Sequence, residues 1–287
     1  MNRISKVALI LCACFVSVTW GQQPAGTCSN NWTEFHRPNM RRWNPCEKVL
    51  GVNNVGNLSL KWSFATASGV YSSPAVANGV VYVGSEDRYL YALNARTGVK
   101  LWSYFTVFEL FSSPAVANGV VYFGSWDRNL YALNASTGAL LWRYNTGEVS
   151  SSPAVANGVV YVGGIDGNVY ALNAKTGARL WRFHTRNDVF SSPAVANGVV
   201  YVGSDDGNVY ALNAKTGAKL WSYATRNGYG VDSSPAVANG VVYVGSEDGN
   251  VYALNARTGV KLWSYATGNL GAVLARGGEW DGVCWLG

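Results

Sequence analysis

The sequence predicts an all-β protein, a β-propeller of four-stranded antiparallel blades with five complete blades and an incomplete sixth. The segment SSPAVANGVVY occurs five times without a substitution. Its prolines recur at intervals of 40, 39, 40 and 42 residues, at Pro74, Pro114, Pro153, Pro193 and Pro235. No interval shows helical periodicity, and propeller blades are four-stranded units of about forty residues.

The composition fits a folded, turn-rich β protein. Of the 287 residues, 48% are apolar and 13% are charged, so the chain can bury a large core. Its 33 glycines suit the many turns that short strands need. The net charge of +6 comes from scattered basic residues. No nucleic-acid partner is therefore expected.

Residues 1–21 resemble a secretory signal peptide. Two basic residues precede the apolar run VALILCACFVSV, and Thr19 and Gly21 are small residues suited to cleavage. The alternative is a lipoprotein signal in which Cys14 carries the lipid. No later stretch is long and apolar enough to cross a bilayer. A periplasmic or secreted protein is expected, with lipid anchoring as the alternative.

Residues 22–56 are expected to form an N-terminal cap segment. In an oxidising compartment Cys28 and Cys46 would form a disulfide that closes a short loop ahead of the repeats. The alternative is a pair of unpaired thiols. In the cap held by this disulfide, three aromatic side chains would pack on the propeller: Trp32, Phe35 and Trp43.

Residues 57–272 are expected to form the propeller. In the fourth copy, SSPAVA, VVYVGS, VYALNA and KLWSYAT read as four strands, and the turn Asn197-Gly198 joins the first two. The second strand is apolar on both faces, with Val199 and Tyr201 on one and Val200 and Val202 on the other. Such a sheet must be covered on both sides, so neighbouring blades are expected to pack face to face.

The second half of each unit resembles the docking motif of pyrroloquinoline-quinone-type propellers. ALNARTGVKLW at 92–102 is the first of five matches to Ala-x-Asp-x-x-Thr-Gly-x-x-x-Trp, and Asn replaces Asp in all five. In that family the Trp packs between adjacent blades. The resemblance implies this structural role for Trp102, Trp142, Trp181, Trp221 and Trp263.

The chain also carries parts of a further blade. LSLKWSFAT at 58–66 matches a fourth strand, which adds Trp62 to the docking tryptophans. At the other end, a shift of one base lets the codons of residues 273–287 spell SSPAVANG at the spacing of the repeats. We interpret 273–287 as an out-of-frame remnant of a sixth repeat; an authentic tail is the alternative. Resequencing around codon 273 would separate the two.

Few residues suggest catalysis. His36 and His184 are the only histidines, which excludes a site of several histidines and leaves little for a serine-type triad. The acidic pairs of the hairpins fit ordinary turn preferences. The connections between blades vary most, and this variation makes them a candidate binding rim. Its candidate residues are Glu109, Arg186, Asp188, Tyr229 and Asp232, with unconstrained surface loops as the alternative.

The expected function is that of an exported, non-catalytic scaffold without a cofactor, acting as a monomer on an unknown protein, small-molecule or glycan partner. The outer-membrane assembly lipoprotein of the same repeat family is the resemblance that suggests it. One alternative is a dehydrogenase that uses pyrroloquinoline quinone (PQQ) with calcium. The resemblance to such enzymes implies an adjacent cysteine pair, which this sequence lacks. A sugar-binding propeller is the other alternative.

Overall fold

The structure, a computed structural model, describes residues 53–267. The expected signal peptide, the Cys28–Cys46 pair and the shifted segment 273–287 lie outside the described residues. Within residues 53–267, no helix has the length and apolar character needed to span a membrane.

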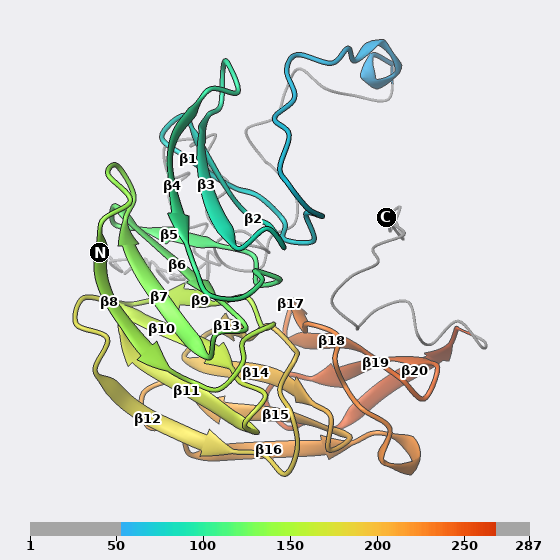
Figure 1. Cartoon of the computed structure of the whole chain (residues 1–287). Coiled ribbons are helices and arrows are strands. Elements are labelled where there is room, and N and C mark those ends of the chain that lie inside the picture. The colour runs from blue at the N-terminus through green and yellow to red at the C-terminus, as the bar shows by residue number, and fades with distance from the viewer. Residues whose placement is uncertain (1–52, 268–287) are drawn as a thin grey trace, which may run out of the picture.

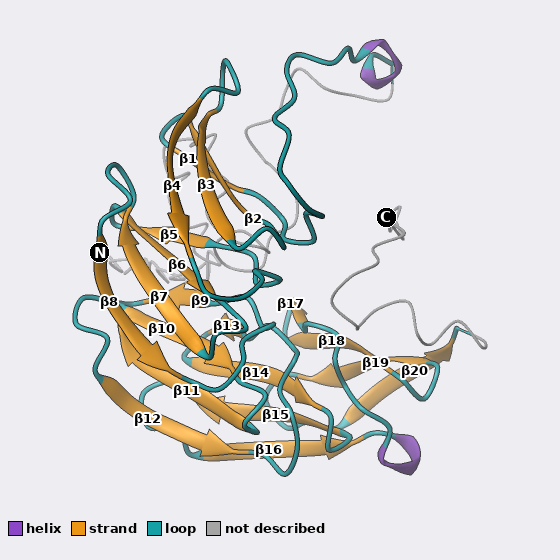
Figure 2. Cartoon of the chain, viewed as in Figure 1, coloured by secondary structure: helices purple, strands orange, loops and turns teal. Residues whose placement is uncertain are grey.

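Five four-stranded antiparallel sheets make up the described chain, and they confirm the predicted all-β class and its blades (Figures 1 and 2). Blade 1 contains β1 (Ala75–Ala77), β2 (Val80–Gly84), β3 (Tyr89–Asn94) and β4 (Lys100–Phe105). The later strands are β5 (Ala115–Ala117), β6 (Val120–Gly124), β7 (Asn129–Asn134), β8 (Leu140–Asn145), β9 (Ala154–Ala156), β10 (Val159–Gly163), β11 (Asn168–Asn173), β12 (Arg179–His184), β13 (Ala194–Ala196), β14 (Val199–Ser204), β15 (Asn208–Asn213), β16 (Lys219–Ala224), β17 (Ala236–Ala238), β18 (Val241–Ser246), β19 (Asn250–Asn255) and β20 (Lys261–Ala266). Two single 3-10 turns complete the elements, η2 (Val55–Asn57) and η3 (Arg226–Gly228).

The first hairpin of each blade follows the Asn-Gly prediction. In blade 1, Asn78 and Gly79 have φ angles of 50° and 77°, and Ala77 pairs with Val80 across the turn. Asn and Gly tolerate positive φ better than other residues, which explains why this pair recurs. The first strand is shorter than SSPAVA because it begins after Pro74, whose nitrogen cannot donate to a ladder.

Neighbouring blades share apolar cores. Leu90 of β3 belongs to the same buried cluster as Val121 and Phe123 of β6, and all three side chains are fully buried. The first strands contact each other in the order β1, β5, β9, β13 and β17. They lie toward the middle of the assembly, with the fourth strands outside (Figure 1). Each sheet is therefore covered on both faces by its neighbours, except at the ends of the series.

In blades 1 to 4, a tryptophan of the fourth strand joins the blade to the next one. The Trp102 indole lies over Gly138, where an added Cβ would come within 2.8 Å of the ring. Its Nε1–H donates to the Ala135 carbonyl at 3.1 Å. The hydroxyl of Tyr82, also from blade 1, donates to the same carbonyl at 3.0 Å. We call this arrangement the tryptophan junction, and its ring-on-glycine pairs are Trp102–Gly138, Trp142–Gly177, Trp181–Gly217 and Trp221–Gly259.

The Asn that replaces Asp in the docking motif shapes the turn beneath the indole. Asn134 Oδ1 accepts the backbone N–H groups of Ser136 and Thr137, at 3.0 and 3.1 Å. This cap needs only one acceptor oxygen, which the Asn amide has in common with a carboxylate. The replacement therefore keeps the turn that presents Gly138, whose φ is 73°.

Both ends of the blade series depart from this pattern. Residues 58–66 form no ladder among the described residues, yet Trp62 covers Gly98 and its Nε1–H donates to the Ala95 carbonyl at 3.1 Å. At the other end, Trp263 is 45% exposed, whereas Trp221 is 9% exposed. Among the described residues β17 makes no contact with β1 comparable to those between neighbouring first strands. Trp62 thus repeats the tryptophan–glycine contact ahead of blade 1, and the incomplete sixth blade stays a prediction.

The junction predicts a difference between two glycine substitutions. Gly177 and Gly158 both have positive φ, but an added Cβ meets the Trp142 ring at 2.7 Å only at Gly177. Gly158→Ala is expected to cost about 1–2 kcal/mol from backbone strain alone. Gly177→Ala should cost about 1–3 kcal/mol more because it displaces the ring. Urea unfolding of both variants measures the difference, and equal losses would contradict the role given to the junction.

Candidate functional site

The connections between blades and the second hairpins form one end of the propeller, which we call the linker face. The connection 107–111 lies between two blades: Leu110 N–H donates to the Ser85 carbonyl of blade 1, and Trp126 N–H of blade 2 donates to the Glu109 carbonyl. The Asn-Gly and Thr-Gly turns meet at the other end, where Ala95 N–H donates to the Gly79 carbonyl. The uniform turns and the variable connections therefore lie at opposite ends of the blades.

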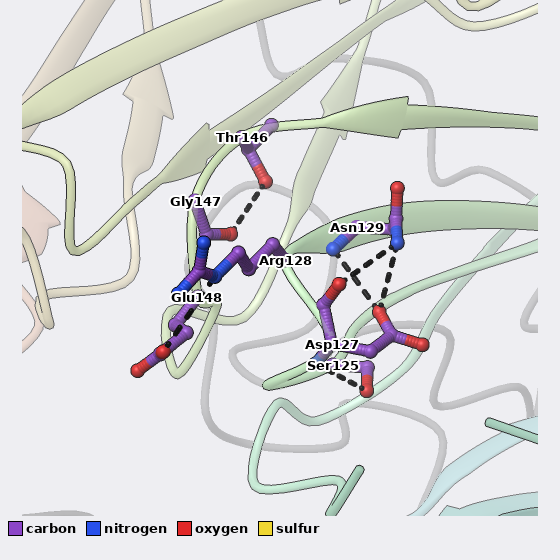
Figure 3. Close-up of polar contacts among 7 residues, drawn as sticks. All are labelled: Ser125, Asp127, Arg128, Asn129, Thr146, Gly147 and Glu148. Carbon is purple, nitrogen blue, oxygen red and sulfur yellow. Dashed lines mark hydrogen bonds and ion pairs between the residues drawn. The ribbon is translucent and has the colours of Figure 1, made fainter. Parts of the chain in front are cut away.

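An aspartate in each second hairpin is held by bonds within the fold. Asp127 accepts the Tyr131 hydroxyl at 2.6 Å and the Asn129 N–H at 3.1 Å. Figure 3 shows this hairpin, in which Ser125 Oγ also accepts the Asp127 N–H. Burial, and then the bond to Asp127, raise the pKa of Tyr131. The same tyrosine bond recurs at Asp87, Asp127, Asp166, Asp206 and Asp248.

These aspartates therefore serve the hairpins, as the turn interpretation of the acidic pairs predicted. In four blades the same carboxylate also accepts a backbone N–H from the connection that enters its blade, as Asp206 Oδ2 does from Arg186 at 3.1 Å. A carboxylate with these partners is positioned to order the connection rather than to exchange protons with a substrate.

A serine relay also encircles the inner strands, and the sequence reading missed it. Ser113 N–H donates to Ser152 Oγ of the next blade at 2.9 Å, and Ser152 N–H donates to Ser192 Oγ at 2.9 Å. The preceding serine of each pair acts within its own blade, as Ser112 Oγ does in accepting Gly124 N–H at 3.1 Å. The invariance of Ser-Ser-Pro was the available signal, since the first serine bonds a backbone group of its own blade and the second bonds the next blade.

The candidate rim residues do not form one cluster. Glu109 is half-buried beside Trp126, and Asp232 is buried just before the first strand of blade 5. Arg186 is exposed and Tyr229 is 52% exposed. The Thr225 hydroxyl donates to the Tyr229 carbonyl, which fixes that connection. His184 is exposed on β12, and its ring lies near the Asn187 carbonyl, since an added Cβ on Gly167 would approach both.

Among the candidate rim residues, Asp188 has a carboxyl group whose pKa is raised by its surroundings. Burial raises the pKa of its carboxyl, and the negative charges of Asp205, Glu148 and Asp166 raise it further. Asp205 N–H donates to the Asp188 carbonyl at 2.9 Å, which brings these two blade-4 residues together. The neighbouring Glu148 forms an exposed ion pair with Arg128, in which Oε1 and Nε are 3.8 Å apart (Figure 3). An exposed ion pair of this kind contributes little to stability.

Three aromatic side chains gather at blades 1 and 2. The ring centroids of Tyr71 and Phe111 are 5.8 Å apart, and those of Phe111 and Trp126 are 4.6 Å apart. Trp126 Nε1–H donates to Ser150 Oγ at 2.8 Å. Tyr71 and Trp126 are each 37% exposed. We call Tyr71, Phe111 and Trp126 the aromatic shelf; the sequence reading missed it, although only blade 2 has Trp at the position of Trp126.

A metal-dependent quinone would need a group of metal-binding side chains on the linker face. Within residues 53–267 no three His, Cys, Asp or Glu side chains come together in a group that could hold a metal ion. The hairpin aspartates, which are the repeated carboxylates of this face, are already bonded to tyrosines. The described residues therefore do not fit a site for a metal-bound quinone.

A family model described as outer membrane protein assembly factor BamB matches residues 58–148, 108–192 and 127–275. Together these matches span more than half of the chain. The chain belongs to this family of PQQ-like propellers. No curated protein sequence matches it.

Solved structures of PQQ-like propellers share the fold. Quinohemoprotein alcohol dehydrogenase ADHIIG from Pseudomonas putida HK5 is 24% identical with a TM-score of 0.72, over 82% of this chain and 48% of that one. A europium-containing methanol dehydrogenase is 18% identical with a TM-score of 0.72, over 82% and 58%. BamB from Moraxella catarrhalis is 22% identical with a TM-score of 0.51, over 73% and 80%. The chain thus spans about half the length of the dehydrogenases, and these likenesses show the fold alone.

The position of Asp188 in this PQQ-like propeller predicts a pH-dependent effect of Asp188→Asn. A carboxyl whose pKa is raised by folding favours the folded state below its unfolded pKa of about 3.9, and this contribution is lost as the pH rises through the folded pKa. At pH 7 the Asn variant avoids that loss, so its Tm should exceed that of the wild type. Near pH 3 the two Tm values should converge. A lower Tm for the variant at pH 7 would contradict the cause assigned to the shift.

Proposed function

We propose that this PQQ-like propeller is an exported, non-catalytic scaffold that binds a partner at its linker face. The main observation behind the proposal is that the repeated polar groups of that face form hydrogen bonds with other groups of the fold. Asp127, for example, is bonded to Tyr131 and Asn129. The serines of the inner strands bond from blade to blade. The residues that vary from blade to blade are then available to recognise a partner. This arrangement suits a binding surface better than a reaction centre.

The comparisons support the same assignment. The matching family model carries the description of an assembly factor, and BamB from Moraxella catarrhalis is covered over 80% of its length. An assembly factor of this kind works by holding other proteins, so the proposal needs no catalytic residue. Export agrees with the expected signal peptide at residues 1–21, and a periplasmic or secreted location is part of the proposal.

A PQQ-dependent dehydrogenase is the second candidate, because the dehydrogenases match with TM-scores of 0.72. The available metal ligands argue against a dehydrogenase, since within residues 53–267 no three His, Cys, Asp or Glu side chains come together in a group that could hold a metal ion. A sugar-binding propeller is the third candidate, and the aromatic shelf is the feature that favours it, because exposed rings are suited to stacking.

An assay with added quinone tests the non-catalytic proposal. The purified protein is incubated with pyrroloquinoline quinone and calcium, and dye reduction is followed with methanol, ethanol and glucose. A quinoprotein alcohol dehydrogenase prepared in parallel is the positive control. We expect no reduction above that of quinone and calcium without protein. Alcohol- or sugar-dependent turnover that requires this protein would overturn the scaffold assignment.

A further inference from the structure

The aromatic shelf is a rigid, partly exposed surface at the variable end of the propeller. Its three rings follow one another at 5.8 and 4.6 Å, so each ring limits the movement of the next. The bond from Trp126 Nε1–H to Ser150 Oγ fixes the indole from the side of blade 3. The aromatic faces that remain exposed are therefore presented in a set arrangement, which lowers the entropic cost of stacking a ligand on them.

The shelf depends on a break in the repeat at Trp126, whereas the position of Phe111 is also aromatic in blades 1 and 4, as Tyr71 and Phe190. Trp126 occupies a hairpin position that is Glu86 in blade 1 and Ile165 in blade 3. Phe111 directly precedes Ser-Ser-Pro, where blade 3 has Ser150. Blade 3 folds with Ser and Ile at these two positions, so the fold does not require the aromatic pair.

Carboxylates border the shelf. An added Cβ on Gly69 would lie 2.8 Å from Glu86 Oε2 and 3.0 Å from the Tyr71 ring, so the carboxylate and the ring flank the same space. The backbone carbonyl of Glu109 accepts the backbone N–H of Trp126; the Glu109 side chain is half-buried and makes no ion pair among the described residues.

Carboxylates recur at one set of paired positions around the linker face. Hydrogen bonds between connection and hairpin pair 69 with 86, 109 with 126, 148 with 165, 188 with 205 and 230 with 247. Six of these ten residues are Asp or Glu and none is Lys or Arg, whereas the arginines of this face lie at other positions of the hairpins and connections, at 88, 128, 186 and 226. In blades 4 and 5 the carboxylates of Asp205 and Glu247 both approach Gly230. The raised pKa of Asp188 reflects its burial first, and then the negative charges of Asp205, Glu148 and Asp166.

We propose that the aromatic shelf and its bordering carboxylates bind an arginine-rich peptide segment of a partner protein. This inference rests on the proposed scaffold function and names its ligand. A guanidinium group is planar, so it stacks on aromatic rings while its N–H groups bond carboxylates at the edge. The carboxylates at the paired positions continue from the shelf to blades 4 and 5, which suits an extended chain with several cations better than a single small cation.

The test uses the full chain and a fluorescein-labelled peptide of alternating Arg and Gly. Fluorescence anisotropy should show saturable binding that weakens as salt is added. The double variant Phe111→Ser with Trp126→Ile, which copies the residues of blade 3, should weaken binding about tenfold or more. Glu86→Gln should also weaken it. Phe105→Ala is the matched control, because Phe105 is a 53% exposed aromatic on β4 and its counterpart in blade 4 is Ala224; it should leave the affinity unchanged.

Several results would overturn the inference. These are absence of peptide binding, equal binding of a Glu-Gly peptide, or an unchanged affinity in the folded double variant, with folding checked by thermal unfolding. Preferential binding of neutral oligosaccharides on a glycan array would assign the shelf to sugars instead. The quinone assay is independent of all of these. If the protein shows neither turnover nor peptide binding, the arginine-peptide inference fails and the scaffold proposal stands; quinone-dependent turnover overturns the scaffold proposal itself.

Discussion

The tryptophan junction is the interaction on which the rest of the structure depends. A single blade has two apolar faces and cannot bury both within itself. The junction sets one blade on the next by placing an indole over a glycine and by directing two hydrogen bonds, from Trp102 and Tyr82, to the Ala135 carbonyl. A side chain on Gly138 would occupy the space of the ring, which is why the motif keeps glycine at this site.

This constraint divides the molecule into invariant and variable parts. The Asn-Gly turn, the Ser-Ser-Pro segment and the hairpin aspartates serve every blade in the same way, so they cannot distinguish one blade from another. Individual character lies mainly in the connections and in the second hairpins, where Trp126 and Glu86 differ between adjacent blades. Recognition of a partner is therefore expected where the repeat is broken, and the aromatic shelf is such a place.

Much of this architecture could be predicted from the sequence because repetition amplifies weak signals. One Asn-Gly pair predicts a hairpin, and five at a regular spacing predict a propeller. The rim was predicted less well. Tyr71, Phe111 and Trp126 come together from two connections and a hairpin, and no sequence spacing shows that their rings lie in a row. The serine relay was missed because a bond from Ser113 N–H to Ser152 Oγ crosses between blades.

The most direct measurement compares Trp221→Ala with Trp263→Ala by urea unfolding. Both tryptophans occupy the same place in the motif, but Trp221 covers Gly259 and donates to the Ala256 carbonyl, whereas Trp263 is 45% exposed. Trp221→Ala should lower the free energy of unfolding by about 3–5 kcal/mol, and Trp263→Ala by about 1 kcal/mol or less. Equal losses in the two variants would contradict the claim that the junction, rather than packing within each blade, holds the blades together.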